Sequence, residues 1–209
     1  ATETMPGHAE MFTSLSADLT GVADNSNRGP VPDGSSIMER LEGLLGTNNL
    51  ATIMIVSKSK IGTLFASAPQ TLDLVDAADR SAPETGVRVL AALEKYGKRR
   101  FLAVLHFQDP DLAGHWRGSD SKEYRQTTVI CDSWLGQIMG WLKKENMEKR
   151  TLIYVMADHG FDHAARAHSN APASWLATND KAVKHGGTIA DVPATIMKRF
   201  GVNLEEIDP

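Results

Sequence analysis

The chain has 209 residues, of which 22 are lysine or arginine and 26 are aspartate or glutamate, so its formal net charge is −4. Hydrophobic residues make up 42% and charged residues 23%, a composition that excludes a disordered chain, a collagen-like repeat and a coiled coil. The mild acidity and the lack of a basic stripe also disfavour a nucleic-acid-binding surface, because such surfaces neutralise phosphates with clustered lysine and arginine.

Length and hydropathy indicate the domain organisation. One domain per roughly 150 residues is a reasonable prior, so we expect a single domain over residues 1–209. No run of about 18 apolar residues predicts a membrane span, and no charged-then-apolar leader precedes the first motif. The chain begins at Ala1 rather than at methionine. We expect a soluble protein and assign it neither a compartment nor an oligomeric state.

Predicted helices and strands alternate along the chain. Capping boxes of the form S-x-x-E predict helices that begin at Ser36 and at Ser81, the second running towards Tyr96. Apolar residues at spacings of three and four predict a long helix from about 121. We expect a last helix over about 192–200. Continuous apolar runs predict buried strands over 50–56, 101–107 and 151–156, and a short strand near 175–177. This alternation predicts an α/β fold with a mainly parallel central sheet and helices on both faces.

The first segment has the features of a helix N-terminus that carries a hydroxyl group. Pro6 suits the first turn of a helix, which puts Thr4 at or just before the first helical residue. Backbone N–H groups and the helix dipole favour an anion at that place. A threonine becomes a nucleophile when its pKa is lowered, which coordination to a metal ion achieves. Thr4 is therefore a candidate nucleophile, with a plain helix N-cap as the alternative.

Two predicted strands run directly into polar motifs, at the edge of the sheet where ligands bind in folds of this class. Asp111 and His115 follow one strand, and a tight turn there would direct both side chains at one ion. Asp158 and His159 follow the next long strand, where the chain bends into a loop. Carboxylate and imidazole groups together are good ligands for zinc or manganese.

Histidines are concentrated in the second half of the chain. Five of the seven lie between positions 115 and 185, which is too clustered for scattered structural roles. Besides the two already named, these are His163, His168 and His185. A single histidine is more often structural than a ligand, so the metal-site hypothesis depends on the whole set.

Together these motifs resemble the alkaline phosphatase superfamily, and most closely its type I phosphodiesterase/nucleotide pyrophosphatase branch. Residues 4–8 (TMPGH) followed by residues 21–25 (GVADN) are similar to the nucleophile segment of that branch. In the family, the threonine that matches Thr4 attacks phosphorus, and the asparagine that matches Asn25 helps to hold the developing negative oxygens. The resemblance therefore implies a metal-dependent hydrolase that cleaves phosphodiester or nucleotide pyrophosphate bonds through a phospho-enzyme intermediate at Thr4.

The resemblance also implies two divalent metal ions, zinc or, as the alternative, manganese. By this resemblance the first ion would be held by Asp111, His115 and a later histidine, and the second by Asp158, His159 and the Thr4 hydroxyl. We expect the later histidine to be His168, because residues 168–172 (HSNAP) are similar to a segment of the related metal-dependent mutases. His185 and His163 are the alternatives.

Members of the family begin with a hydrophobic strand that ends in a metal-binding aspartate. The chain begins three residues before Thr4, so we expect that strand and its aspartate to be missing and the domain to be N-terminally incomplete. Two alternative functions stay open, a phosphomonoesterase of the same superfamily and a catalytically inactive truncated fragment. The expected partner is a small phosphate ester, for which Phe12, Trp116 and Phe161 are candidate pocket residues because they lie near the motifs.

Overall fold

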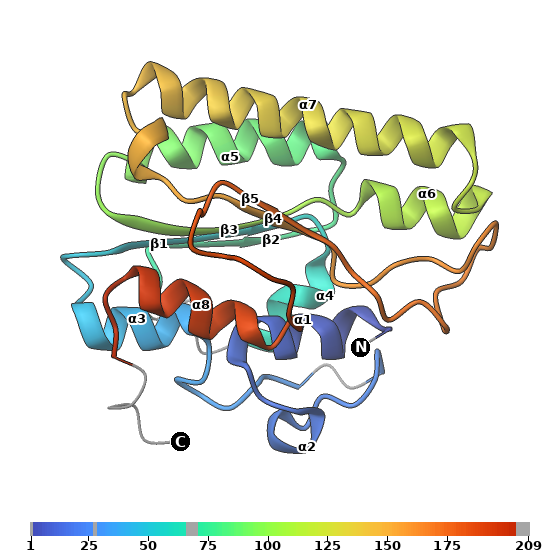
Figure 1. Ribbon diagram of the computed structural model, residues 1–209, viewed down its shortest axis with the longest axis horizontal. Coiled ribbons are helices and arrows are strands. Elements are labelled where there is room, and N and C mark those ends of the chain that lie inside the picture. Colours follow the sequence, from blue (N-terminus) through green and yellow to red (C-terminus); the bar gives the residue numbers. More distant parts are fainter. Residues whose placement is uncertain (1, 27–28, 66–70, 204–209) are drawn as a thin grey trace.

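The computed structural model describes residues 2–26, 29–65 and 71–203. It confirms the predicted α/β fold, with a parallel sheet between two layers of helices (Figure 1). Within these ranges, none of the helices combines the length and the apolar composition that crossing a bilayer requires.

The parallel sheet has three strands in the order β2-β1-β3. These strands are β1 (Ala51–Val56), β2 (Leu74–Ala77) and β3 (Phe101–His106). The central strand β1 is buried throughout, and its residue Ile53 lies opposite Leu74 on one side and Ala103 on the other. β1 and β3 match two predicted strands. The sequence does not predict β2, because a short strand that contains Asp76 lacks a continuous apolar run.

Side chains of β1 alternate between two hydrophobic cores, one on each face of the sheet. Met54 and Val56 belong to one core, whereas Ile53 and Ile55 belong to the other. The first core is covered by α1 (Thr4–Thr13), α3 (Ile37–Leu45) and α8 (Asp191–Arg199), and the second by α5 (Ala82–Tyr96) and α7 (Lys122–Lys144) (Figure 1). Burial on both faces explains why the sequence of this strand is continuously apolar.

Three helices begin where the sequence predicts. Ser36 and Glu39 form a capping box at the start of α3, and Ser81 and Glu84 form one at the start of α5. In both boxes the glutamate carboxylate accepts a hydrogen bond from the backbone N–H of the serine. Helix α7 begins after Ser121, whose hydroxyl accepts from the backbone N–H three residues on. The described residues also form short helical segments: α2 (Ala17–Thr20), α4 (Ser59–Gly62) and 3-10 helices at Thr63–Phe65 and Glu148–Arg150.

The prediction of a tight turn after β3 is wrong, because the chain forms helix α6 (Asp109–Arg117) there. Pro110 and two acidic residues lie in the first turn of this helix, where proline and negative charge are both favourable. The helix ends at Gly118, which has a φ of 97°. Asp111 and His115 still lie side by side, because residues four apart in sequence are neighbours on one helical face.

A separate two-stranded sheet pairs β4 (Tyr154–Met156) with β5 (Leu176–Thr178) in antiparallel orientation. The strand predicted over 151–156 is shorter in the structure, where β4 begins at Tyr154. The side chain of Asn179 accepts from the N–H of Ile153 and donates to the carbonyl of Thr151, so these groups take no part in a ladder. Among the described residues, no strand pairs with the second edge of β3 or of β4. The absence of a first strand stays a prediction.

Asp180 connects the β4-β5 sheet to α8. One carboxylate oxygen accepts hydrogen bonds of 2.6 Å from the Tyr154 hydroxyl and from Nε of Arg199. The other oxygen accepts from the N–H of Ala182. The bonds from Tyr154 and Arg199 favour the ionised form and lower the pKa of Asp180 to about 2. The charged carboxylate therefore stabilises the folded chain.

We predict that Asp180→Asn lowers the free energy of unfolding by about 2 kcal/mol at pH 7, since it removes the charge that these donors bind. In the wild type, this contribution is fully present above the ordinary aspartate pKa of about 3.9. It is lost as the pH falls from there through the folded-state pKa of about 2. Urea titrations at pH 7 and pH 3 measure both effects. The control is Asp132→Asn on the exposed face of α7, and equal unfolding midpoints for the two variants would contradict the prediction.

Candidate metal site

Strand ends and one helix N-terminus meet at one edge of the structure. Thr4 begins α1, Lys58 follows β1, Asp111 lies in the helix after β3, and Asp158 follows β4. Direct contacts join these segments, because Nζ of Lys58 is 2.6 Å from Oδ2 of Asp111 and Oδ2 of Asp158 is 3.4 Å from Nδ1 of His8 in α1. Carboxyl ends of parallel strands are the usual ligand-binding edge of an α/β fold.

Asp111, His115 and His168 form the first half of the site. Oδ1 of Asp111 is 3.4 Å from Nε2 of His115 and 4.0 Å from Nε2 of His168, and the two nitrogens are 3.2 Å apart. Zinc–ligand bonds of about 2.0–2.1 Å in tetrahedral geometry place two ligand atoms roughly 3.3 Å apart. The three atoms therefore have nearly the spacing that one ion requires.

Backbone carbonyls fix three imidazole rings in one orientation. Each ring donates from Nδ1 to a carbonyl oxygen: His115 to Arg166, His168 to Thr2, and His159 to Gly160. A carbonyl only accepts, so in a neutral ring the proton is on Nδ1 and Nε2 carries a lone pair. Burial is the main cause that lowers the pKa of His168, and the neighbouring His159 lowers it further. The ring of His168 is therefore neutral at pH 7. Metal-binding histidines in proteins are held in this way.

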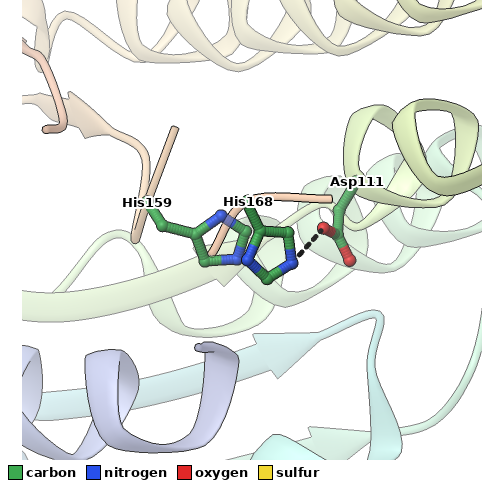
Figure 2. A group of neighbouring side chains, drawn as sticks. All are labelled: Asp111, His159 and His168. Atoms are coloured by element: carbon green, nitrogen blue, oxygen red, sulfur yellow. Dashed lines mark ion pairs between the residues drawn. The ribbon is translucent and has the colours of Figure 1, made fainter. Parts of the chain in front are cut away.

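Two ligand atoms of this cluster are buried without a hydrogen-bond partner, Oδ1 of Asp111 and Nε2 of His159. Ligand atoms of Asp111, His159 and His168 all lie within 4.8 Å of one another. Figure 2 shows the His168 ring beside that of His159 and directed at the Asp111 carboxylate. Burying acceptor atoms that face one another without a hydrogen-bond donor costs free energy. A cation bound between these atoms would offset that cost. The donor set suits zinc or manganese, so the residues fit a divalent ion.

Asp158 extends the cluster towards α1. Its Oδ2 is 3.4 Å from Nε2 of His159 and 3.4 Å from Nδ1 of His8. Burial lowers the pKa of His8, and it lowers that of the neighbouring His106 to about 3. Both rings are therefore neutral at pH 7 and bring no formal charge to the carboxylate. Asp158 and His159 thus offer a carboxylate oxygen and an imidazole nitrogen at a second position for a cation.

Thr4 is the first residue of α1 and not its N-cap, which is Glu3. The side chain of Asn25 takes over the capping, because its Oδ1 accepts from the N–H of Met5 at 3.0 Å. The same oxygen accepts from Nζ of Lys60 at 3.1 Å. Both partners are donors, so the amide oxygen is fixed there and the Nδ2 donor group of Asn25 is turned away from them.

Lys58 is a central residue of the site that the sequence motifs do not point to. Its Nζ donates to Oγ1 of Thr4 at 3.3 Å as well as to Asp111, and its side chain is 15% exposed. One signal was available, since Lys58 and Lys60 directly follow a buried strand whose carboxyl end faces the site.

The Phe161 ring packs edge-on against the cluster. Its centroid is 5.3 Å from that of His115 and 5.3 Å from that of His168. Gly114 makes this position available, because a β-carbon at residue 114 would lie 2.5 Å from Cζ of Phe161. The glycine that precedes His115 therefore has a packing role in the site.

Four residues singled out from the sequence do not contribute to the cluster. His163 and His185 are exposed, and within the part of the chain that the structure describes no hydrogen bond or ion pair joins either to it. Phe12 is a buried core residue, and Trp116 on α6 is 72% exposed. His168 is thus the histidine that the structure places beside Asp111 and His115.

Known proteins share parts of this sequence. The profile of the family described as type I phosphodiesterase / nucleotide pyrophosphatase matches residues 53–207. A 2,3-bisphosphoglycerate-independent phosphoglycerate mutase of Pseudomonas fluorescens (strain Pf0-1) is 30% identical over 132 residues, which are 59% of this chain and 25% of the mutase. Venom phosphodiesterase 2 of Crotalus adamanteus is 32% identical over 65 residues, which are 31% of this chain and 8% of the venom protein.

The fold also occurs among solved structures. The structure of BT4656 in complex with its substrate D-glucosamine-2-N,6-O-disulfate matches with a TM-score of 0.70 and 12% sequence identity. The match covers 97% of this chain and 68% of that chain. At this level of identity the likeness establishes the α/β architecture over nearly the whole chain and nothing about the ligand.

We predict that His168→Ala weakens zinc binding by more than about 100-fold, because it removes a ligand whose ring is already oriented for the ion. His185 is an exposed histidine outside the cluster. The variant His185→Ala is therefore the matched control and should bind zinc as the wild type does. Isothermal titration with zinc chloride measures both affinities. A larger loss in His185→Ala than in His168→Ala would reverse the choice between the two histidines.

Proposed function

Because the chain belongs to the type I phosphodiesterase / nucleotide pyrophosphatase family, we propose that it is a metal-dependent hydrolase of phosphodiester or nucleotide pyrophosphate bonds. The observation that carries this proposal is the set of three ligand atoms on Asp111, His115 and His168, spaced by 3.2 to 4.0 Å. The hydroxyl of Thr4 is linked to the same group through Lys58. A nucleophile, ligands for a cation and an anion-binding helix terminus are then together at one edge of the sheet.

The proposed cofactors are two divalent ions, zinc or alternatively manganese. Asp111, His115 and His168 would hold one ion, and Asp158, His159 and the hydroxyl of Thr4 would hold the other. When bound, such ions polarise phosphoryl oxygens, lower the pKa of a coordinated hydroxyl and stabilise the leaving oxygen.

The nucleophile in this proposal is Thr4. Its Oγ1 gives up its proton to water and forms a bond to phosphorus, while the bond from phosphorus to the leaving oxygen breaks and that oxygen takes up a proton from water. A diester substrate thereby leaves a phosphothreonine that still carries its second ester group. The start of α1 favours the anionic phosphoryl group through its N–H groups and dipole. Asn25 donates from Nδ2 to a phosphoryl oxygen as negative charge develops on it. Water then attacks phosphorus, the bond to Thr4 breaks, and the threonine regains its proton.

Two alternatives lead to different measurements. A phosphomonoesterase of the same superfamily is favoured by Lys58, because a monoester dianion carries more negative charge than a diester. Such an enzyme would hydrolyse p-nitrophenyl phosphate faster than bis(p-nitrophenyl) phosphate. A catalytically inactive fragment would turn over neither substrate, with or without added zinc or manganese.

We predict that Thr4→Ala lowers the hydrolysis of bis(p-nitrophenyl) phosphate at least about 1000-fold, as removal of a covalent nucleophile does in other hydrolases. Zinc affinity should change little, because Asp111, His115 and His168 are untouched. The matched control is Thr128→Ala, at an exposed position on α7, and it should keep full activity. Wild-type rates in Thr4→Ala would eliminate Thr4 as the nucleophile.

We predict that Asn25→Ala lowers kcat about 100-fold, which corresponds to the roughly 3 kcal/mol typical of one lost transition-state donor. Asn25→Asp separates this role from capping of α1, since it keeps an oxygen for the N–H of Met5 and lacks the Nδ2 donor. Both variants should lose kcat to a similar extent. Recovery of kcat in Asn25→Asp would assign the loss to helix capping instead.

A further inference from the structure

Lys58 lies between the proposed nucleophile and a proposed metal ligand. It is the N-cap residue of α4, directly beyond the carboxyl end of β1, and its side chain is mostly buried. Nζ is 2.6 Å from Oδ2 of Asp111 and 3.3 Å from Oγ1 of Thr4. A buried ammonium needs an anionic partner, and the Asp111 carboxylate provides one.

Asp111 is shared between two kinds of partner. Its Oδ2 accepts from Lys58, whereas its Oδ1 faces the Nε2 atoms of His115 and His168. A divalent ion held by Oδ1 and the two imidazoles would therefore share one carboxylate with the Lys58 ammonium. The one negative charge of Asp111 cannot compensate both the ammonium and the divalent ion. The two cations, on either side of one carboxylate, would also repel each other. The excess positive charge lies beside Thr4, where the phosphoryl group would be.

We propose that Lys58 is an anion-binding residue of this site, whose ammonium binds a non-bridging phosphoryl oxygen of the substrate beside Thr4. The pairing of Lys58 with Asp111 then opposes metal binding, and the substrate anion takes over the ammonium once a divalent ion holds the carboxylate. This role rests on the proposed function, because it requires that a phosphoryl group binds at Thr4.

Lys60 supports the same assignment. Its Nζ donates at 3.1 Å to Oδ1 of Asn25, the oxygen that also accepts from the N–H of Met5, so the Nδ2 group of that amide is turned away from both donors. The donor end of Asn25 and the ammonium of Lys58 are then both available to phosphoryl oxygens. Charge-assisted hydrogen bonds of this type are stronger than neutral ones, so Lys58 would contribute to affinity as well as to position.

The test is Lys58→Met, which keeps an unbranched side chain of similar length and removes the charge. Isothermal titration measures zinc binding to the protein and then inorganic phosphate binding to the zinc-loaded protein. We expect zinc affinity to rise about tenfold and phosphate affinity to fall about tenfold, the scale of one charged interaction at a partly screened site. Opposite changes in the two affinities are the decisive result, because a merely structural residue would not produce them.

Controls separate the possible outcomes. Lys98→Met, at a position that is 62% exposed and paired with Glu94 and Glu145, should leave both affinities unchanged. Lys58→Arg keeps the charge and should retain most of the phosphate affinity. Unchanged phosphate affinity in Lys58→Met would overturn the proposal, as would equal weakening of zinc and phosphate binding. Loss of the folded state in both Lys58→Met and a second variant, Lys58→Gln, would assign the residue to structure.

The wild-type titrations separate this inference from the proposed function. A wild-type protein that binds neither zinc nor phosphate contradicts the proposed function itself. A wild-type protein that binds both, together with a Lys58→Met variant that binds phosphate equally well, contradicts the role of Lys58 alone.

Discussion

The candidate site depends on hydrogen bonds from imidazole Nδ1 groups to backbone carbonyls. His115, His159 and His168 each donate in this way, so each ring presents the lone pair of Nε2 to the same small volume. The carbonyl that orients His168 belongs to Thr2, next to the proposed nucleophile and far away in sequence. This contact therefore links the orientation of a proposed ligand to the segment that begins α1.

The sheet supplies the rigid frame for these bonds. Strand β1 is buried on both faces and paired on both edges, and Lys58 follows it within two residues. Asp111 lies in the first turn of α6, which follows β3, so its place is determined by a strand that pairs with β1 along its whole length. The parallel sheet thus holds Lys58 and Asp111, whereas His159 and His168 lie in the segment between β4 and β5.

Patterns in the sequence predict the elements that are long and strongly apolar, and they predict less where side chains compete with the backbone. Strand β1 and the capped helices are predicted because their signals are local. The start of β4 is not, because Asn179, distant in sequence, bonds to Thr151 and Ile153 in place of a strand. Asp111 and His115 are identified by their spacing although the helix that carries them is not. Lys58 has no spacing signal, and its contacts with Thr4 and Asp111 exist only once three segments have come together.

Gly114 shows how a position without chemical function can control one that has it. The Phe161 ring lies against α6 where a side chain would otherwise begin, and it contacts the rings of His115 and His168. One added methyl group at residue 114 would displace this ring and, through it, two imidazoles whose lone pairs must converge within a fraction of an ångström. Inactivating variants of this protein should therefore be sought among substitutions that add atoms near the site as well as among those that remove functional groups.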